Sequence, residues 1–367
     1  MHALFYVGDR QWSGCARAFL AAARGLGARG HDVCIACCGG STLERRAHEF
    51  GIDPVLINDP ESGFSSGWDL RKVLQERAID VVFVISERDQ LIVSSAMTRL
   101  GGLVIRRIPT LETLDLQRGG KLALRIANGG LLVSSERELQ ELQGLRPTGW
   151  TVPPTTAPIG VDATAYDDIR PLERRDLGIP PTDLLVACPY EPSGRYRVAT
   201  VLRTFAFLVP RHPDLHLVIV GPGSNDEELR MHAAALGVNP AVTFLGERDD
   251  EIAVLRTADI GWPVASGDGG AYGFLDLAAA RVAVVSEATP LAQQYVSDGI
   301  NGILLPPADP AITASRVASF IAHGEARAAM ANAARARVQR DFPESAMVDG
   351  FERAAQATIG RAKTAVP

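Results

Sequence analysis

The sequence has few histidines and aromatic residues, and it has no long uninterrupted apolar run. Its 367 residues include 7 histidines, 5 cysteines and 6% aromatic side chains. A membrane-spanning helix needs roughly 18 or more consecutive apolar residues, and no run approaches that length. No basic segment precedes an apolar one at the N-terminus, as it would in a secretory signal. We therefore expect a cytoplasmic protein, one that can still be peripheral to the inner face of a membrane.

Positive charge is not in excess, and cysteines are not spaced as metal ligands. Lysine and arginine number 37 against 43 aspartates and glutamates, a net charge of -6, so we expect no nucleic-acid partner. Cys34, Cys37 and Cys38 lie close together, but no second cysteine or histidine pair follows at the spacing of a zinc site. We expect buried, reduced thiols and no metal site.

Apolar segments and segments with helical spacing alternate along the chain. Residues 2–8, 31–38 and 79–86 are largely apolar runs, and each is followed by a helical pattern. Strands that are apolar throughout and joined by helices are typical of a parallel sheet covered on both faces. A second alternating series follows, and the chain is too long for one typical core. The predicted fold is α/β with GT-B architecture, in which two Rossmann-like, doubly wound parallel-sheet domains face a central cleft.

The two series are separated by a segment rich in proline, threonine and aspartate, residues 146–181. Such composition is typical of a linker between domains. We predict an N-terminal domain over residues 1–168, a C-terminal domain over 169–342, and a separate final helix over 343–367.

The segment SGDGGAYGFLD, residues 266–276, differs from the rest of the second series. Four glycines accompany two aspartates, Asp268 and Asp276, which are eight positions apart. Carboxylates can accept hydrogen bonds from hydroxyl groups, and glycines allow backbone N–H groups to approach a phosphate. Considered alone, the pattern also fits a loop that caps a helix.

This segment and its neighbours resemble the GT-B-type retaining glycosyltransferases of glycosyltransferase group 1, or family four. The matching blocks are LHLVIVGPGS, LGVNPAVTFLGE, LRTADIGWPV, LAAARVAVVS and VSDGINGILLPPAD. The first half matches more loosely, through ARGHDV, LLVSS and PIGVDATAYD. The resemblance implies a hexosyltransferase-like enzyme that moves a sugar from a nucleotide-diphosphate sugar to an unidentified acceptor, with retention of configuration and without a metal or other cofactor. It also implies that the helix in 343–367 crosses back to the N-terminal domain.

Members of the family carry two glutamates separated by seven residues, and here aspartates stand at both positions. The resemblance implies that Asp268 is the catalytic carboxylate against the donor sugar and that Asp276 binds the ribose. Gly269, Gly270 and Ala271 would bind the donor, with backbone N–H groups of the glycines facing the diphosphate. Because aspartate is one methylene shorter than glutamate, the backbone must lie closer to the donor.

The cations that the family aims at the diphosphate are also replaced. An arginine and a lysine are usual in the first strand-to-helix loop of the second domain, where this chain has Glu191 and Tyr196. We predict that the neighbouring Arg195 and Arg197 bind the phosphates instead, because arginine is a good bidentate phosphate ligand.

The first domain departs from the family in two places. A serine and Gly14 replace a glycine pair in the first loop, where we predict that Gly14 contacts the donor. The family has a histidine against the donor sugar, but no histidine lies between His48 and His212. Arg106 and Arg107 fall in that neighbourhood and are the predicted acceptor-side residues.

Two other functions remain open. The first is a catalytically impaired, nucleotide-sugar-binding partner or regulator of an active transferase. The second is a nucleotide-sugar epimerase with the same fold, against which the scarcity of histidine weighs. The acceptor is expected to be a carbohydrate, a lipid-linked molecule or a small molecule. Residues 99–125 carry six basic side chains against two acidic ones, which fits an acidic acceptor, an anionic lipid surface or a solvated loop.

Overall fold

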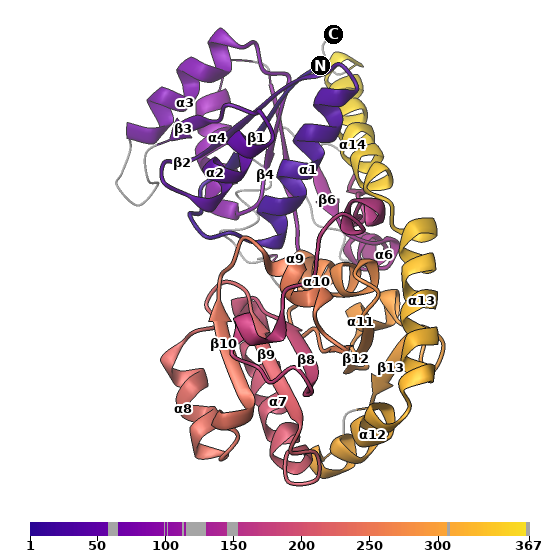
Figure 1. The fold of residues 1–367 in the computed structure, drawn as a ribbon. Coiled ribbons are helices and arrows are strands. Elements are labelled where there is room, and N and C mark those ends of the chain that lie inside the picture. The colour runs from indigo at the N-terminus through magenta and orange to yellow at the C-terminus, as the bar shows by residue number, and fades with distance from the viewer. Residues whose placement is uncertain are drawn as a thin grey trace. The chain divides into compact units, whose positions relative to one another are not determined.

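The protein divides into two compact units in a computed structural model (Figure 1). Unit 1 consists of Met1–Ile159 with Glu344–Pro367, and unit 2 of Gly160–Pro343. The structure describes residues 1–57, 65–98, 100, 102–111, 114, 130–144, 153–306 and 309–364, with only the backbone for 65–69 and 361–364.

The ends of unit 2 lie side by side. Val161 donates through its backbone N–H to the carbonyl oxygen of Phe342 at 3.0 Å. A Cβ added to Gly160 would lie 2.8 Å from the carbonyl carbon of Pro343, so this approach requires a glycine. The predicted domain boundaries follow residues 168 and 342, and in the structure the chain divides after Ile159 and after Pro343.

Unit 1 is built on a seven-stranded parallel sheet with the order β3-β2-β1-β4-β5-β6-β7. The strands are β1 His2–Val7, β2 Asp32–Cys38, β3 Val55–Ile57, β4 Val81–Val84, β5 Leu103–Arg107, β6 Leu131–Val133 and β7 Thr155–Thr156. The central strand β1 is buried from Ala3 onward because it has a strand on each side and helices over both faces.

The helices of unit 1 are α1 Gly14–Ala28, α2 Thr42–Glu49, α3 Ser65–Glu76, α4 Glu87–Met97, α6 Glu136–Gly144 and α14 Glu344–Thr364. The last helix, α14, packs against α1, although the two lie at opposite ends of the sequence (Figure 1). Phe351 of α14 packs in an aromatic cluster with Phe5, Phe19 and Phe83, with ring centroids between 5.3 and 5.9 Å from its own. The spacing in RGGKLALRIANGG, residues 118–130, also predicts a helix, but residues 118–129 lie outside the described part of the chain.

Unit 2 contains a six-stranded parallel sheet with the order β10-β9-β8-β11-β12-β13. Its strands are β8 Leu184–Pro189, β9 Leu215–Val220, β10 Val242–Gly246, β11 Ile260–Gly261, β12 Ala283–Glu287 and β13 Gly302–Leu305. Its helices are α7 Arg195–Leu208, α8 Glu227–Ala235, α9 Glu251–Arg256, α10 Gly267–Ala279, α11 Pro290–Tyr295, α12 Pro310–Ala322 and α13 Gly324–Asp341.

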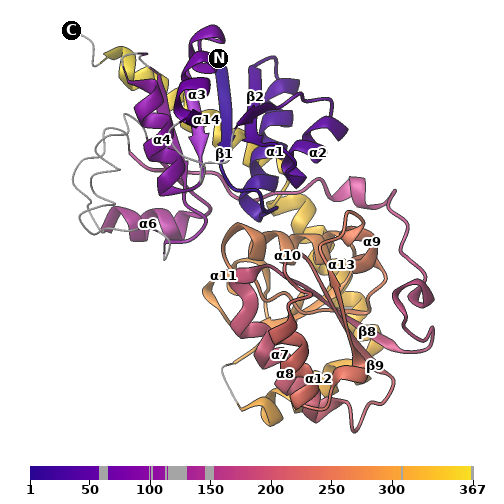
Figure 2. The ribbon, with the colours of Figure 1, turned by 90° about the vertical axis from the view of Figure 1, so that its left-hand side faces the viewer.

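The helices of unit 2 form two layers with the sheet between them (Figure 2). Helix α7 packs with α8 and α12, whereas α10 packs with α9, α11 and α13. Two doubly wound parallel sheets are thus present, and the predicted α/β fold class is confirmed.

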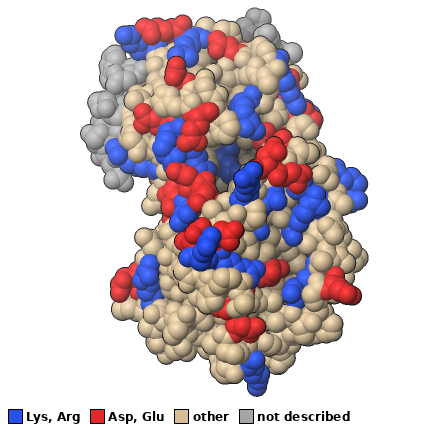
Figure 3. Space-filling model, viewed as in Figure 1, with Lys and Arg blue, Asp and Glu red and all other residues tan. Residues whose placement is uncertain are grey.

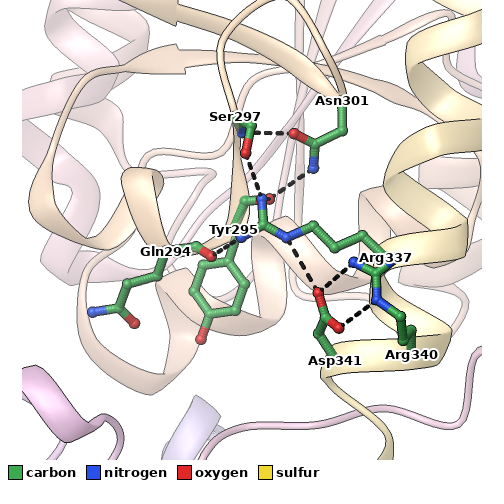
Figure 4. Close-up of polar contacts among 7 residues, drawn as sticks. All are labelled: Gln294, Tyr295, Ser297, Asn301, Arg337, Arg340 and Asp341. Carbon is green, nitrogen blue, oxygen red and sulfur yellow. Dashed lines mark hydrogen bonds and ion pairs between the residues drawn. The ribbon is translucent and has the colours of Figure 1, made fainter.

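An arginine of α13 ties this helix to the segment before β13 (Figure 4). Arg337 donates to the carbonyl oxygens of Gln294 at 2.8 Å and Tyr295 at 3.1 Å, at the end of α11. Asn301, which is buried, donates to the same Tyr295 oxygen at 2.8 Å. Carbonyl groups at a helix C-terminus lack partners within the helix, so these side chains satisfy them. The Tyr295 ring also stacks on Phe274 of α10 at 5.7 Å, so the network supports the helix that carries both predicted site aspartates.

Candidate functional site

The strand order of each sheet identifies where a ligand would bind. In open α/β sheets, ligands bind outside the carboxyl ends of the strands, at the point where the strand order reverses. That point lies between β8 and β11 in unit 2, and between β1 and β4 in unit 1. Helices α7 and α10, which follow β8 and β11, contain most of the predicted donor-binding residues.

The glycine-rich segment after β11 is mainly helical. Helix α10 begins at Gly267, whose φ of 62° makes the turn into the helix, and Gly269 and Gly270 belong to the helix itself. Gly267 thus makes the turn that opens the helix, and the residues between the two aspartates are all helical. Asp268 and Asp276 are both buried, with 1% and 3% of their surfaces exposed. Their eight-residue separation corresponds to about 12 Å along the helix axis.

The second aspartate has a partner within unit 2. The phenol of Tyr166 donates a hydrogen bond to Oδ1 of Asp276. Tyr166 ends the short 3-10 helix η3, Ala163–Tyr166, and its carbonyl oxygen accepts from Arg256. The ribose contact predicted for Asp276 stays a prediction, and a ribose hydroxyl there would share the carboxylate with Tyr166.

The loop after β8 places a carboxylate at the start of α10. The side chain of Glu191 lies against Gly269, where an added Cβ would overlap the carboxylate. The same loop also accepts a hydrogen bond at Ser193 Oγ from the backbone N–H of Ser266, at 3.2 Å. A negative charge is favourable at a helix N-terminus, where N–H groups lack partners within the helix. Unit 2 thus holds a carboxylate of its own where the resemblance implies a diphosphate.

The two arginines predicted to bind phosphate point to different surroundings. Arg195 forms ion pairs with Glu228 and, at 3.6 Å, with Asp226, both at the start of α8. Arg197 donates to the carbonyl oxygen of Val264 at 3.3 Å and lies 3.9 Å from the carboxylate of Glu287. Only Arg197 thus contacts the segment that leads into α10.

A small cavity lies beside Arg197 at the ends of β11, β12 and β13. Its volume is about 20 Å³, and Trp262, Glu287 and Thr313 contribute to its lining. This is room for about one water molecule, whereas sites for small-molecule ligands typically measure ~300–1,000 Å³. This cavity is therefore too small to hold a nucleotide sugar.

Unit 1 has a larger cavity, at its own point of strand-order reversal. Its volume is about 500 Å³, within the range of small-molecule sites, and its lining includes Asp9, Arg10, Ser13, Arg88 and Asp89. Sequence reasoning identified none of the four charged residues as site residues. In the sequence, charged residues follow the apolar runs that form β1 and β4. The strand order has to be known, however, before the residues after β1 can be placed beside those after β4.

Asp89 is the buried acid of this cavity, with 5% of its surface exposed. It completes the capping box of α4 with Ser86, whose hydroxyl accepts from the Asp89 N–H at 3.0 Å. Burial raises the pKa of the Asp89 carboxyl, and hydrogen bonds from Ser86 and the Gly8 backbone oppose this rise. The carboxyl therefore stands at the wall of a ligand-sized cavity with a perturbed pKa, a common property of functional acids.

The other predicted residues of unit 1 lie outside the lining of this cavity. Gly14 is buried as the first residue of α1, directly after Ser13, which does line it. Arg107 is fully buried and donates to the Ala157 carbonyl at 3.1 Å and the Ser134 hydroxyl at 3.2 Å. Arg106, on the opposite face of β5, is also buried, and donates to the Gln90 side chain at 3.4 Å. Arg107 in particular occupies a core position within unit 1.

The second part of the chain matches a known family. Residues 169–337 match the family described as glycosyl transferases group 1. The chain is 28% identical over 214 residues, 54% of its length, to D-inositol 3-phosphate glycosyltransferase of Corynebacterium jeikeium, covering 51% of that protein. It is 31% identical over 189 residues, 50% of its length, to phosphatidyl-myo-inositol mannosyltransferase of Mycolicibacterium smegmatis, covering 47% of that protein. The chain thus spans about half the length of these curated relatives.

Solved structures resemble the chain over nearly its whole length. Anabaena HepE in complex with UDP-glucose superposes with a TM-score of 0.79 at 16% identity, covering 97% of this chain and 100% of HepE. WaaG, a glycosyltransferase involved in lipopolysaccharide biosynthesis, gives 0.70 at 18% identity, covering 98% and 100%. At such low identity the likeness concerns the fold, which is that of GT-B glycosyltransferases.

Proposed function

Because residues 169–337 match the family described as glycosyl transferases group 1, we propose that the protein transfers a sugar from a nucleotide-diphosphate sugar to a hydroxyl-bearing acceptor, with retention of configuration. The observation that carries the proposal is the placement of α10. This helix starts at the point of strand-order reversal in unit 2, with Asp268 buried in its first turn. Backbone N–H groups at a helix start and a nearby carboxylate suit a ligand with both phosphate and hydroxyl groups.

Each part of the donor has a proposed partner. Asp268 accepts hydrogen bonds from the sugar, and Asp276 from the ribose. The start of α10, at Gly269, stabilises the negative charge that develops on the leaving diphosphate, so no metal ion is required for that role. The predicted role of the Gly270 N–H is not met, because this group donates to the Ser266 carbonyl at 3.2 Å. Arg197 adds positive charge beside the same segment.

The acceptor is proposed to bind in the cavity of unit 1. Asp9 and Asp89 can accept from hydroxyl groups there, while Arg10 and Arg88 suit an acidic group on the acceptor. Two curated relatives are named for D-inositol 3-phosphate and phosphatidyl-myo-inositol, which combine hydroxyl and phosphate groups. A carbohydrate or lipid-linked acceptor is therefore compatible with the residues present.

The described structure bears on membrane contact in two ways. No helix in the described part of the chain is long and apolar enough to cross a membrane. Figure 3 shows acidic and basic side chains interspersed over the face in view, with no dominance of one sign on that face. A cytoplasmic location, with or without contact at a membrane surface, stays a proposal.

The first test is thermal stability in the presence of UDP, GDP, dTDP and ADP. A matching nucleotide at about 100 times its dissociation constant should stabilise the folded state by ~2.7 kcal/mol. Replacing Asp268 with alanine should abolish release of nucleoside diphosphate from the matched nucleotide sugar, yet leave nucleotide binding nearly intact. The exposed Asp176 of the same unit, replaced by alanine, is the matched control and should behave as wild type. The proposal fails if no nucleotide stabilises the protein and no nucleotide sugar is turned over.

A second candidate is a nucleotide-sugar-binding partner or regulator with impaired catalysis. The observation that favours it is Glu191 at the start of α10, together with the ion pairs that engage Arg195. Such a protein would bind a nucleotide sugar but release no nucleoside diphosphate from it with any acceptor. Measuring binding and turnover with the same nucleotide sugar separates the two functions.

A further inference from the structure

We propose that Glu191 limits the affinity of unit 2 for diphosphates, because it holds its own carboxylate where the donor diphosphate would bind. The inference rests on the proposed donor site and names the residue that tunes it. It makes Glu191 a determinant of donor affinity, in the position where related enzymes carry an arginine.

The first support is that the helix start lacks a cap of its own. Ser266 precedes α10 but makes no side-chain hydrogen bond to the first turn. Glu191 precedes the short helix η5, Pro192–Gly194, and makes no capping hydrogen bond to that helix either. Its carboxylate instead occupies the space beside Gly269. Glu191 is thus directed at α10, where its charge stabilises the helix N-terminus as a phosphate would.

The second support is that the loop is held in this position by its backbone. Tyr190 donates to the Val220 carbonyl at 2.8 Å, and Gly194 donates to the Glu191 carbonyl at 2.8 Å. A Cβ added to Gly194 would lie 3.0 Å from the backbone of Val264, so this loop packs closely on the segment before α10. The backbone of Glu191 is therefore held in place, so its carboxylate can move only by rotation about the side-chain torsions.

The third support concerns the charges nearby. Arg195 is already engaged by Asp226 and Glu228, so its charge is shared with two carboxylates before a phosphate arrives. A diphosphate that approaches the start of α10 then meets the Glu191 carboxylate, and like charges a few ångströms apart repel. Diphosphate binding must displace this side chain or tolerate its charge, and either requirement weakens binding.

The test uses inorganic pyrophosphate as the probe, titrated calorimetrically into the full chain. Glu191→Gln removes the charge at nearly constant size, and it should lower the dissociation constant for pyrophosphate by about tenfold or more. Glu191→Asp keeps the charge but retracts it by one methylene, so we expect a smaller gain. Glu227→Gln, in the first turn of α8, is the matched control and should leave the constant unchanged. Circular dichroism verifies the fold of each variant, and the aspartate variant carries the test if the glutamine variant unfolds.

The proposal is overturned if neither Glu191 variant binds pyrophosphate more tightly than wild type, if none of the proteins binds it, or if Glu227→Gln gives an equal gain. Failure of the donor assignment would look different. If Glu191→Gln binds pyrophosphate more tightly but no nucleoside diphosphate stabilises the protein, the role of Glu191 is supported and the proposed donor is wrong. If UDP stabilises the protein but Glu191→Gln does not change pyrophosphate binding, the proposed donor is supported and the role of Glu191 is wrong.

Discussion

Two glycines of α14 should respond in opposite ways to replacement by alanine. Alanine is favoured over glycine inside a helix by about 1 kcal/mol. At Gly360 an added Cβ meets nothing within 4 Å, so Gly360→Ala should stabilise unit 1 by roughly 0.5–1 kcal/mol. At Gly350 the same Cβ would lie 2.5 Å from the Cα of Ala157 and 2.9 Å from the Thr156 carbonyl oxygen.

The contact at Gly350 cannot be relieved by a side-chain rotation, because the obstacle is backbone. Ala157 is held in place by the hydrogen bond from its N–H to the Val133 carbonyl, at 2.9 Å. Helix α14 must therefore move away, and overpacking of this kind typically costs ~1–3 kcal/mol. After the gain in helix propensity is subtracted, Gly350→Ala should destabilise unit 1 by roughly 0.5–2 kcal/mol.

Scanning calorimetry of the full chain should show the two shifts in melting temperature. For a domain of this size, 1 kcal/mol corresponds to a shift of about 2–4 °C. The difference between the variants isolates the close approach of α14, since both changes carry the same gain in helix propensity. Equal shifts of the same sign would refute the reasoning.

Two other substitutions test the hydrogen bonds that Tyr166 and Arg107 donate. Tyr166→Phe removes the hydrogen bond to the buried Asp276 carboxylate, so it should destabilise unit 2 by roughly 1.5–3 kcal/mol in urea unfolding; an unchanged midpoint would mean that the bond is not formed. Arg107→Met should destabilise unit 1 by on the order of 3 kcal/mol, because the buried Ala157 carbonyl and the half-buried Ser134 hydroxyl lose their donor. If Arg107→Met melts at the wild-type temperature but no longer binds the acceptor, Arg107 is an acceptor-side residue as the sequence predicted.

The fold could be predicted because its signal is local and repeated. Strands buried on both faces must be largely apolar, as β1 is from Ala3 onward and as β9 is apart from His216, and the helices between them show apolar residues at helical spacing. The start of α10 was harder to predict. The glycines of residues 266–276 suggest a turn, but Gly267 alone makes it, and packing on the sheet keeps the remaining glycines helical.

The candidate site was predicted only where its residues are close in sequence. Asp268, Gly269 and Asp276 lie on one helix, so their proximity follows from the sequence. The contact between Glu191 and Gly269 joins a loop to the first turn of a helix that is distant in the chain, and only the pairing of β8 with β11 brings them together. Asp89 was not predicted as a site residue for the same reason. Its place in the cavity depends on the pairing of β4 with β1, which the sequence does not reveal.

The charges around α10 suggest which part of the donor supplies its affinity. Asp268 and Asp276 are carried by the helix, and Glu191 is directed at its start. Carboxylates accept hydrogen bonds from hydroxyl groups but repel phosphate, so these three acids favour the sugar and ribose over the diphosphate. If the proposed donor site is correct, the nucleotide sugar should bind more tightly than the nucleoside diphosphate left after transfer. Transfer of the sugar would then lower the affinity for the remaining nucleoside diphosphate and promote its release. Product release limits turnover in many enzymes.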